Sequence, residues 1–413
     1  MQLRRKAYIL VTMVNEKSNE EKQKIVVVGG GFGGIKAALE LSRNSEFEVT
    51  LVSDKVDFRY NPTLFHTATG GLFRQSAIPL ENIFSGGKIN FIHGELIKID
   101  RVTRSIELAG GAIVAYDKLV LALGVVTNYF GVEGLKEFSY GIKSPEEVLH
   151  FKKHLHTILQ TERKPDVNYI IVGGGPTGVE LAGALPAYIK QIMKHHNIKP
   201  KKINVKIIEA SPRLLPRSAE KVSAAVTKRL KKLGVDVLVD KSVKALDEDS
   251  LLVGSKDIPS HSVVWTAGTS NNAFFKENDF TLTEKGKVAV DEHLMAEKDV
   301  YVIGDNASTP HSGLAQTAVY DGHYVAHDIE AKHHGNEGDT YRPKYPATVV
   351  PVGYGWAAFE YKKLIITGWI GWFIRQAADW VGYHDIEPWW KASQQWMTEF
   401  GEEEDCDTCS NSK

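Results

Sequence analysis

The chain has 413 residues, 43% of them hydrophobic and 24% charged, which excludes a disordered protein and favours a globular one of two or three domains. Its 50 basic and 51 acidic residues leave a net charge of -1, so no overall field favours binding to nucleic acid. Both cysteines, Cys406 and Cys409, lie near the C-terminus, which excludes a disulfide scaffold and indicates a reducing compartment.

Residues 1–23 precede the first predicted strand. They open with the basic triplet Arg4-Arg5-Lys6, followed by an apolar stretch, an order that faintly resembles a signal peptide. Because no small-residue cleavage site follows, we expect a disordered extension instead.

A strand, a helix and a second strand are predicted next. Residues 24–28 are rich in β-branched side chains, residues 35–43 are typical of a helix, and residues 49–52 form the second strand. This βαβ order predicts a parallel sheet.

A glycine loop joins the first strand to this helix and has the spacing G-x-G-x-x-G. Such a loop lets a pyrophosphate approach the backbone at a helix N-terminus, so we predict a dinucleotide site. Either Asp54 or, more weakly, Ser53 would bind the ribose hydroxyls. The residues assigned to this first site are Gly29, Gly31, Phe32, Gly33, Gly34, Ser53 and Asp54.

The same order returns later in the chain, with a strand from Asn168, a helix over 179–193 and a strand over 205–208. Its glycine loop contributes Gly173, Gly175, Pro176 and Gly178. This repeat predicts a second nucleotide-binding unit.

Glu209 ends the last strand of this repeat. A carboxylate there accepts both ribose hydroxyls of NAD and repels a 2′-phosphate, so we expect NADH rather than NADPH. Arg213 lies close enough in sequence to weaken that preference.

Three further strands end in small-residue turns, over residues 116–124, 263–268 and 300–305. Together with the two loops they resemble the two-dinucleotide-binding-domain flavoproteins. The resemblance implies an α/β fold of two Rossmann-like domains, similar to glutathione reductase, with non-covalent FAD beside NAD(P)H. It also implies that Asp305 contacts the FAD ribityl–pyrophosphate region. The same resemblance assigns Ala122, Gly124 and Gly304 to FAD and Gly268 to NAD.

Within that group, the lack of any cysteine before Cys406 excludes disulfide reductase chemistry and argues against sulfide:quinone oxidoreductases, which residues 49–70 also resemble. Several segments are similar to the type II NADH:quinone oxidoreductases. They are residues 124–134, 173–180, 209–216, 315–318 and 368–383.

This second resemblance implies that Ala315 and Gln316 lie by the flavin and the quinone pocket. It also gives Glu180 a role in nicotinamide or proton handling, so Glu180 and Gln316 are the predicted catalytic residues. Tyr320 stands where the family has a second glutamine, and it is either a quinone contact or an aromatic side chain that serves packing alone. The family's basic residue near the flavin is missing from residues 351–359.

Simpler interpretations of these residues stay open. Glu180 could be a helix carboxylate favoured by the dipole, and Gln316 an ordinary polar residue of the helix after Pro310. The adjacent pairs His195-His196 and His333-His334 do not share a helix face, so we predict no metal site.

Seven of the eight tryptophans lie between residues 356 and 396, which marks the C-terminal segment as distinct. Apolar residues over 366–381 share one helical face, with Arg375 and Asp379 opposite, and a second amphipathic stretch extends to residue 400. We expect this segment to lie on a membrane surface. The alternatives are packing in a core or in a homodimer interface.

The predicted domains follow from these assignments. Residues 24–145 and 276–350 bind FAD, residues 146–275 bind NAD, residues 351–400 associate with the membrane, and residues 401–413 form a disordered acidic tail. The predicted activity is NADH oxidation through FAD with reduction of a membrane quinone and no proton pumping, on the cytoplasmic face. The alternatives are a reductase of a protein or other non-quinone acceptor, a sulfide:quinone oxidoreductase-like enzyme, and a redox-signalling flavoprotein.

Overall fold

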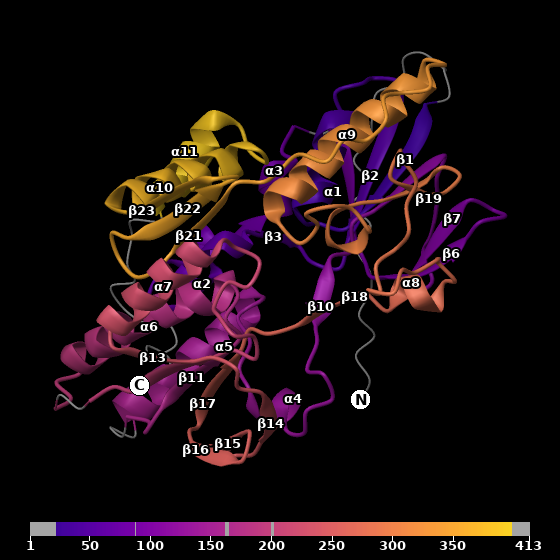
Figure 1. Ribbon diagram of the computed structural model, residues 1–413. Coiled ribbons are helices and arrows are strands. Elements are labelled where there is room, and N and C mark those ends of the chain that lie inside the picture. The colour runs from indigo at the N-terminus through magenta and orange to yellow at the C-terminus, as the bar shows by residue number, and fades with distance from the viewer. Residues whose placement is uncertain (1–21, 87, 162–164, 200–201, 399–413) are drawn as a thin grey trace. The chain divides into compact units, whose positions relative to one another are not determined.

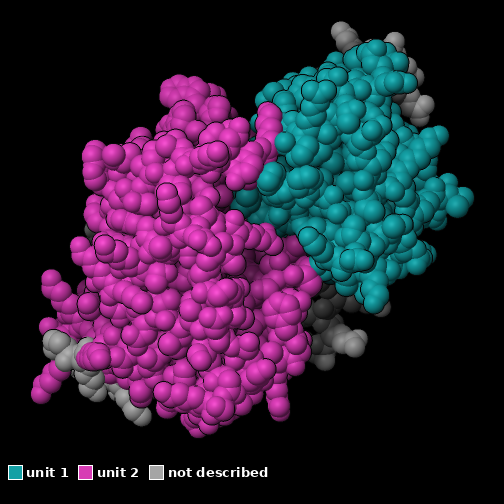
Figure 2. Space-filling model, in the orientation of Figure 1, with its two compact units in different colours: residues 1–56, 80–124, 271–343 teal, residues 57–79, 125–270, 344–413 magenta. Residues whose placement is uncertain are grey.

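The computed structural model describes residues 22–86, 88–161, 165–199 and 202–398. These form two compact units (Figures 1 and 2). Unit 1 contains residues up to 56, 80–124 and 271–343, and unit 2 contains 57–79, 125–270 and those from 344 on. The predicted disordered ends, including Cys406 and Cys409, lie outside the described residues apart from positions 22 and 23.

Unit 1 is built on a six-stranded sheet of order β19-β20-β9-β1-β2-β5. All neighbours are parallel except β19 and β20. The strands are β19 (Met295–Glu297), β20 (Val300–Val302), β9 (Lys118–Leu121), β1 (Gln23–Val28), β2 (Phe47–Ser53) and β5 (Ile89–His93).

Two helices of unit 1, α1 (Phe32–Leu41) and α9 (Ala315–His333), pack side by side (Figure 1). A small antiparallel sheet completes the unit. Its strands are β6 (Leu96–Asp100), β7 (Ser105–Leu108) and β8 (Ile113–Ala115), and the remaining helices are α3 (Leu80–Ile83), α8 (Phe274–Glu277) and the 3-10 turn η4 (Gly304–Asn306).

Unit 2 repeats the parallel arrangement with a four-stranded sheet of order β13-β12-β11-β17. Its helices surround a large apolar core. The strands are β13 (Val235–Leu238), β12 (Val205–Ile208), β11 (Tyr169–Val172) and β17 (Ser262–Trp265). The helices are α2 (Leu64–Ala68), α4 (Leu135–Phe138), α5 (Pro145–His156), α6 (Pro176–His195) and α7 (Glu220–Lys232).

Smaller sheets complete the fold. One of them, formed by β21 (Thr348–Pro351), β22 (Ala357–Tyr361) and β23 (Leu364–Gly368), carries α10 (Trp369–His384), which contacts α11 (Trp389–Met397) (Figure 1). The others are β14 (Val243–Leu246), β15 (Ser250–Val253) and β16 (Lys256–Pro259); β3 (Asp57–Arg59) with β4 (Ala77–Pro79); and β10 (Val125–Thr127) with β18 (Thr269–Asn271).

The predicted α/β fold with two Rossmann-like sheets is confirmed. The strand predicted at 205–208 coincides with β12, and the two predicted helices after the glycine loops are α1 and α6. The apolar helix face predicted over residues 366–381 was wrong at its first residue. Ile366 lies in β23, and the chain turns into α10 at Gly368, whose φ of 95° suits glycine.

Candidate functional site

The parallel strands of unit 1 end together at one edge of the sheet. Val28 of β1 pairs with Val52 of β2 and Leu121 of β9, and Leu121 pairs in turn with Val302 of β20. The residues that follow each strand therefore leave the sheet at the same edge, which is where such folds bind dinucleotides. The structure thus brings the predicted FAD residues of unit 1 to one place.

The glycines of the first loop have different roles. A Cβ placed on Gly29, whose φ is 119°, would lie 2.1 Å from the Ala122 carbonyl oxygen. One placed on Gly34 would lie 2.0 Å from the Gly29 carbonyl oxygen. By contrast, a Cβ on Gly31 would meet no atom within 4 Å. Gly29 and Gly34 are therefore needed for packing, while Gly31 leaves open the side from which a pyrophosphate would approach the start of α1.

Asn306 joins two of the predicted turns and was missed by the sequence analysis. Its Oδ1 accepts from the Gly124 N–H at 2.9 Å, and its Nδ2 donates to the Gly124 carbonyl at 2.7 Å. The side chain is fully buried in the turn that also contains Gly304 and Asp305. Its position beside Asp305 was the only signal in the sequence.

A buried carboxyl group, Asp321 of α9, supports the same turn. Its Oδ2 accepts from the Gly304 N–H at 3.0 Å, and the Tyr341 hydroxyl donates to its Oδ1 at 2.6 Å. Burial raises the pKa of Asp321 to about 6. This residue too was missed, since its partners lie 17 and 20 positions away in the chain, beyond the reach of any local pattern.

The predicted quinone residues belong to α9. Ala315 and Gln316 form its first turn, and the Tyr320 ring lies 5.8 Å from that of Tyr341. Their roles toward a quinone stay predictions.

The two candidates for the FAD ribose differ in burial. Ser53 is buried at the end of β2, and its hydroxyl would lie 2.8 Å from a Cβ placed on Gly30. Asp54 is exposed and pairs with Lys55 at 3.1 Å. Both remain candidates for the ribose hydroxyls.

Unit 2 has a second glycine loop of the same construction. Val172 pairs with Ile208 and Trp265, so Gly173 and Glu209 leave the sheet at one edge. A Cβ on Gly173 would lie 2.6 Å from Thr266 Oγ1, and one on Gly178 would lie 1.9 Å from the Gly173 carbonyl oxygen. A Cβ on Gly175 would meet nothing within 4 Å, as on Gly31, and Pro176 opens α6. The second loop therefore fits a pyrophosphate as the first one does.

Glu209 lies at this loop. Its carboxylate accepts from the Gly174 N–H at 2.6 Å and from the Ser211 N–H at 2.7 Å. Arg213, the residue expected to weaken the preference for NADH, donates to the carbonyls of Leu215 and Pro216 at 3.0 and 2.8 Å. Its guanidinium therefore already has backbone partners.

Gly268 takes part in a turn that needs glycine. Its φ is 73°, and a Cβ there would lie 2.4 Å from the Phe130 ring. Its carbonyl accepts from Lys143 Nζ at 2.8 Å, and burial lowers the pKa of Lys143.

Glu180 is buried in α6 and faces a positive charge that the sequence analysis did not assign. Arg375 of α10 places Nη1 3.4 Å from Glu180 Oε1 and Nε 2.5 Å from Asp379 Oδ2, and its Nη2 donates to the Pro62 carbonyl at 2.7 Å. One guanidinium thus serves two buried carboxyl groups. Burial raises the pKa of Glu180 to about 8 against the opposing effect of Arg375, and it raises the pKa of Asp379 as well.

Two tyrosines complete the cluster around Asp379. The Tyr60 hydroxyl donates to Asp379 Oδ1 at 3.2 Å, and its ring stacks on Tyr383 with centroids 4.1 Å apart. The Tyr383 hydroxyl donates to the Gln75 carbonyl at 3.1 Å. Asp379 is therefore hydrogen-bonded by Tyr60 as well as by Arg375, and Tyr60 is itself held by stacking on Tyr383.

The helix α10 carries its charges on the inside. Its buried residues Gly371, Arg375, Asp379 and Tyr383 recur every four positions. The predicted apolar face is real but exposed. Its exposed members are Trp369, Ile370, Phe373, Trp380 and Val381. Arg375, which had been placed only by its helix face, is therefore a buried positive charge beside Glu180.

The exposed face continues onto α11, where Trp389, Trp390 and Met397 are also exposed. Among the helices of the described residues, none is long and apolar enough to cross a membrane.

Residues 23–322 match the profile of the pyridine nucleotide-disulphide oxidoreductases. The chain is 27% identical over 335 residues to a type II NADH:quinone oxidoreductase of Staphylococcus saprophyticus, covering 75% of this chain and 83% of that one. It is 26% identical over 358 residues to that of Staphylococcus aureus, with coverage of 81% and 88%.

Solved structures show the same fold. NDH2 from Plasmodium falciparum in complex with NADH superimposes with a TM-score of 0.81 at 18% identity, covering 92% of this chain and 98% of that one. The sulfide:quinone oxidoreductase of Aquifex aeolicus does so with a TM-score of 0.73 at 21% identity, covering 90% and 92%.

Proposed function

The chain belongs to the pyridine nucleotide-disulphide oxidoreductase family, and we propose that it is a type II NADH:quinone oxidoreductase, which oxidises NADH through FAD and reduces a quinone without pumping protons. The observation that carries the proposal is the pair of glycine loops. Each ends a parallel strand and leaves one glycine, Gly31 or Gly175, open to a pyrophosphate. The names of the staphylococcal relatives support the quinone as acceptor.

We assign FAD to the loop of unit 1 and NADH to the loop of unit 2. FAD, when bound, supplies the two-electron chemistry, and the protein supplies position and charge. Glu209 favours NADH, since a carboxylate at the end of the second strand repels a 2′-phosphate. The assignment agrees with Asp305 and Asn306 lying in the unit that would hold FAD.

Glu180 is proposed to handle a proton. Reduction of a quinone takes up two electrons and two protons, whereas NADH delivers a hydride, so a further proton is needed. With a pKa of about 8, the buried Glu180 carboxyl holds a proton at neutral pH and can release it. Arg375 and Asp379 position and tune this group rather than react themselves.

The exposed apolar face of α10 and α11 is proposed to rest on a bilayer surface, which would bring the protein to a membrane quinone. Lys362 and Lys363, in the turn before β23, add positive charge suited to anionic headgroups. We place the protein on the cytoplasmic face, where NADH is supplied. A homodimer interface is the alternative use of this face.

Anaerobic stopped-flow of the FAD-loaded protein tests the activity. NADH should bleach the flavin absorbance rapidly, and a soluble quinone analogue should restore it rapidly. Bleaching without recovery would support reduction of the flavin by NADH and contradict reduction of a quinone. A non-quinone acceptor would then gain support, as the tyrosine at position 320 allows. A sulfide:quinone activity is disfavoured because residues 1–405 contain no cysteine.

A further inference from the structure

A cluster of two histidines and a glutamate lies on unit 1, between α1 and α9. Glu40 is near the end of α1, and His323 and His327 are on α9. Glu40 Oε2 lies 2.6 Å from His323 Nδ1 and 3.7 Å from His327 Nε2. The two imidazoles are four residues apart, so they share one helix face and point toward the same carboxylate.

The close packing of the two helices sets this arrangement. A Cβ on Gly322 would lie 2.3 Å from the Gly33 carbonyl oxygen, so the first turn of α1 closely approaches α9 at Gly322. Further along, Asn44 Nδ2 contacts Glu330 Oε1 at 3.5 Å. These two contacts follow in the same order along both segments. Glu40 lies between them in the chain, so they hold its part of α1 against α9.

The ligand atoms suit a divalent transition metal. The potential ligand atoms of the three residues all lie within 4.8 Å of one another. Around a tetrahedral ion bound at about 2.0–2.1 Å, neighbouring nitrogen and oxygen ligands are about 3.3 Å apart. The observed separations of 2.6 and 3.7 Å lie on either side of that value, so small side-chain rotations would form the site.

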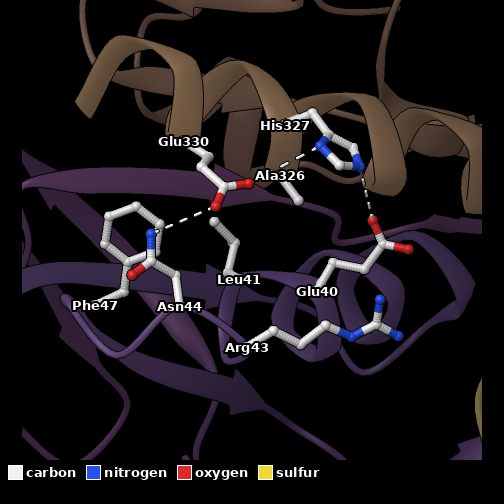
Figure 3. Close-up of a pocket in the computed structure, with 8 residues that line it drawn as sticks. All are labelled: Glu40, Leu41, Arg43, Asn44, Phe47, Ala326, His327 and Glu330. Atoms are coloured by element: carbon white, nitrogen blue, oxygen red, sulfur yellow. Dashed lines mark hydrogen bonds and ion pairs between the residues drawn. The ribbon is translucent and has the colours of Figure 1, made fainter. Parts of the chain in front are cut away.

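The cluster is accessible to solvent, and one carboxylate oxygen of Glu40 faces the two imidazoles. Lys36 pairs with Glu40 Oε1 at 3.1 Å, so Oε2 is the atom that faces the imidazoles. The Glu40 side chain is 10% exposed, whereas His323 and His327 are 45% and 61% exposed, which admits an ion from solvent. Figure 3 shows His327 paired with both Glu40 and Glu330. All three residues line a pocket of about 240 Å³.

We propose that Glu40, His323 and His327 bind one Zn²⁺-type divalent cation, which links α1 to α9. Two imidazole nitrogens and a carboxylate oxygen form a ligand set typical of zinc, and water would complete the coordination. The site is distinct from the glycine loops, and the proposal does not depend on the redox activity. The site was not predicted from the sequence, because its histidines are not adjacent and Glu40 lies 283 positions before His323.

Isothermal titration calorimetry with Zn²⁺ tests the proposal on the untagged, FAD-loaded protein. A Cys406→Ser/Cys409→Ser background removes the two thiols as competing ligands. We expect one site per chain, with affinity weakened by at least about tenfold in His323→Ala and in His327→Ala. His333→Ala is the matched control, because it removes an imidazole of the same helix that pairs with Glu46 instead, and it should bind as the parent does.

A second readout separates binding from misfolding. Zn²⁺ should raise the Tm of the parent and of His333→Ala but not of the two site variants. Retained FAD would show that the site variants are folded. Equal Zn²⁺ affinity in the parent and in both site variants would overturn the proposal, as would the absence of any tight site in the parent.

Discussion

Arg375 lies on the inner face of α10, 3.4 Å from Glu180 of α6, while Trp369 and Phe373 of the same helix are exposed. One helix therefore carries both the proposed membrane contact and the charge partner of the proposed proton-handling group. The charged side chains pack inward against Tyr60 and Glu180, which reverses the usual arrangement of an amphipathic surface helix.

Removing the positive charge of Arg375 should raise the pKa of Glu180 further. In Arg375→Met, burial acts on Glu180 without the opposing guanidinium, so its pKa should rise above about 8. We expect the corresponding transition in the pH profile of kcat to move upward by about one unit or more. Turnover measured from roughly pH 6 to pH 10 reports this shift.

Arg59→Met is the control for that measurement. Arg59 also pairs with a glutamate in unit 2, at 3.4 Å, but that partner, Glu146, is exposed. The pH profile of kcat in Arg59→Met should therefore match that of the parent. An unchanged pH profile of kcat in Arg375→Met would show that the pKa of Glu180 does not depend on the charge that α10 supplies.

The contribution of Glu180 to the stability of the protein should fall as the pH rises through its titration range. Burial gives the folded protein a pKa of about 8 at Glu180, against 4.5 for an ordinary glutamate. Between these values the folded state binds the proton and the unfolded state does not. The stabilisation is therefore complete below about pH 4.5 and lost as the pH approaches 8.

Glu180→Gln isolates this contribution because the amide does not titrate. The difference in unfolding free energy between parent and variant should decline across that window, by no more than about 5 kcal/mol, and be flat above it. Denaturant unfolding at several pH values measures it. A constant difference across the window would contradict the assignment of the raised pKa to Glu180. Turnover should also be lower in this variant.

The sequence was sufficient for features that depend on neighbouring residues. The order strand, glycine loop, helix, strand follows from local spacing and was predicted for both units, whereas the order of the strands within each sheet was not. The partners of Glu180 and Glu40 were not predicted either, because they lie 195 and 283 positions away in the chain. Helical periodicity likewise identified two faces of α10 but could not tell which one meets the core.

Gly31 and Gly34 should respond oppositely to alanine. Gly31 has a φ of -91° and open space, so Gly31→Ala should fold with little change in stability yet bind FAD more weakly, by roughly tenfold or more. In Gly34→Ala the new Cβ meets the Gly29 carbonyl, so folding itself should suffer. Flavin content and Tm distinguish the two. Full FAD affinity in Gly31→Ala would contradict the proposed pyrophosphate position.

Glu209 should govern the choice of nicotinamide cofactor. In Glu209→Gln the repulsion of a 2′-phosphate is lost, so the preference for NADH over NADPH in kcat/KM should narrow by roughly tenfold. Glu220→Gln, which changes an exposed glutamate at the start of α7, should keep the parent's preference. A preserved preference in both variants would mean that another residue selects the cofactor.

Charges on the exposed face of α10 should abolish binding to lipid while leaving the chemistry intact. Trp369 and Phe373 are 66% and 58% exposed, so Trp369→Glu/Phe373→Glu should fold normally and keep its turnover with a soluble quinone analogue. Cosedimentation with vesicles containing anionic lipid should fall by about tenfold or more, since the apolar area that enters the interface is lost. Val102→Glu, which alters an exposed apolar residue of unit 1, should sediment as the parent does. If instead the double variant sediments with vesicles but changes a dimer to a monomer, the face joins two copies of the chain.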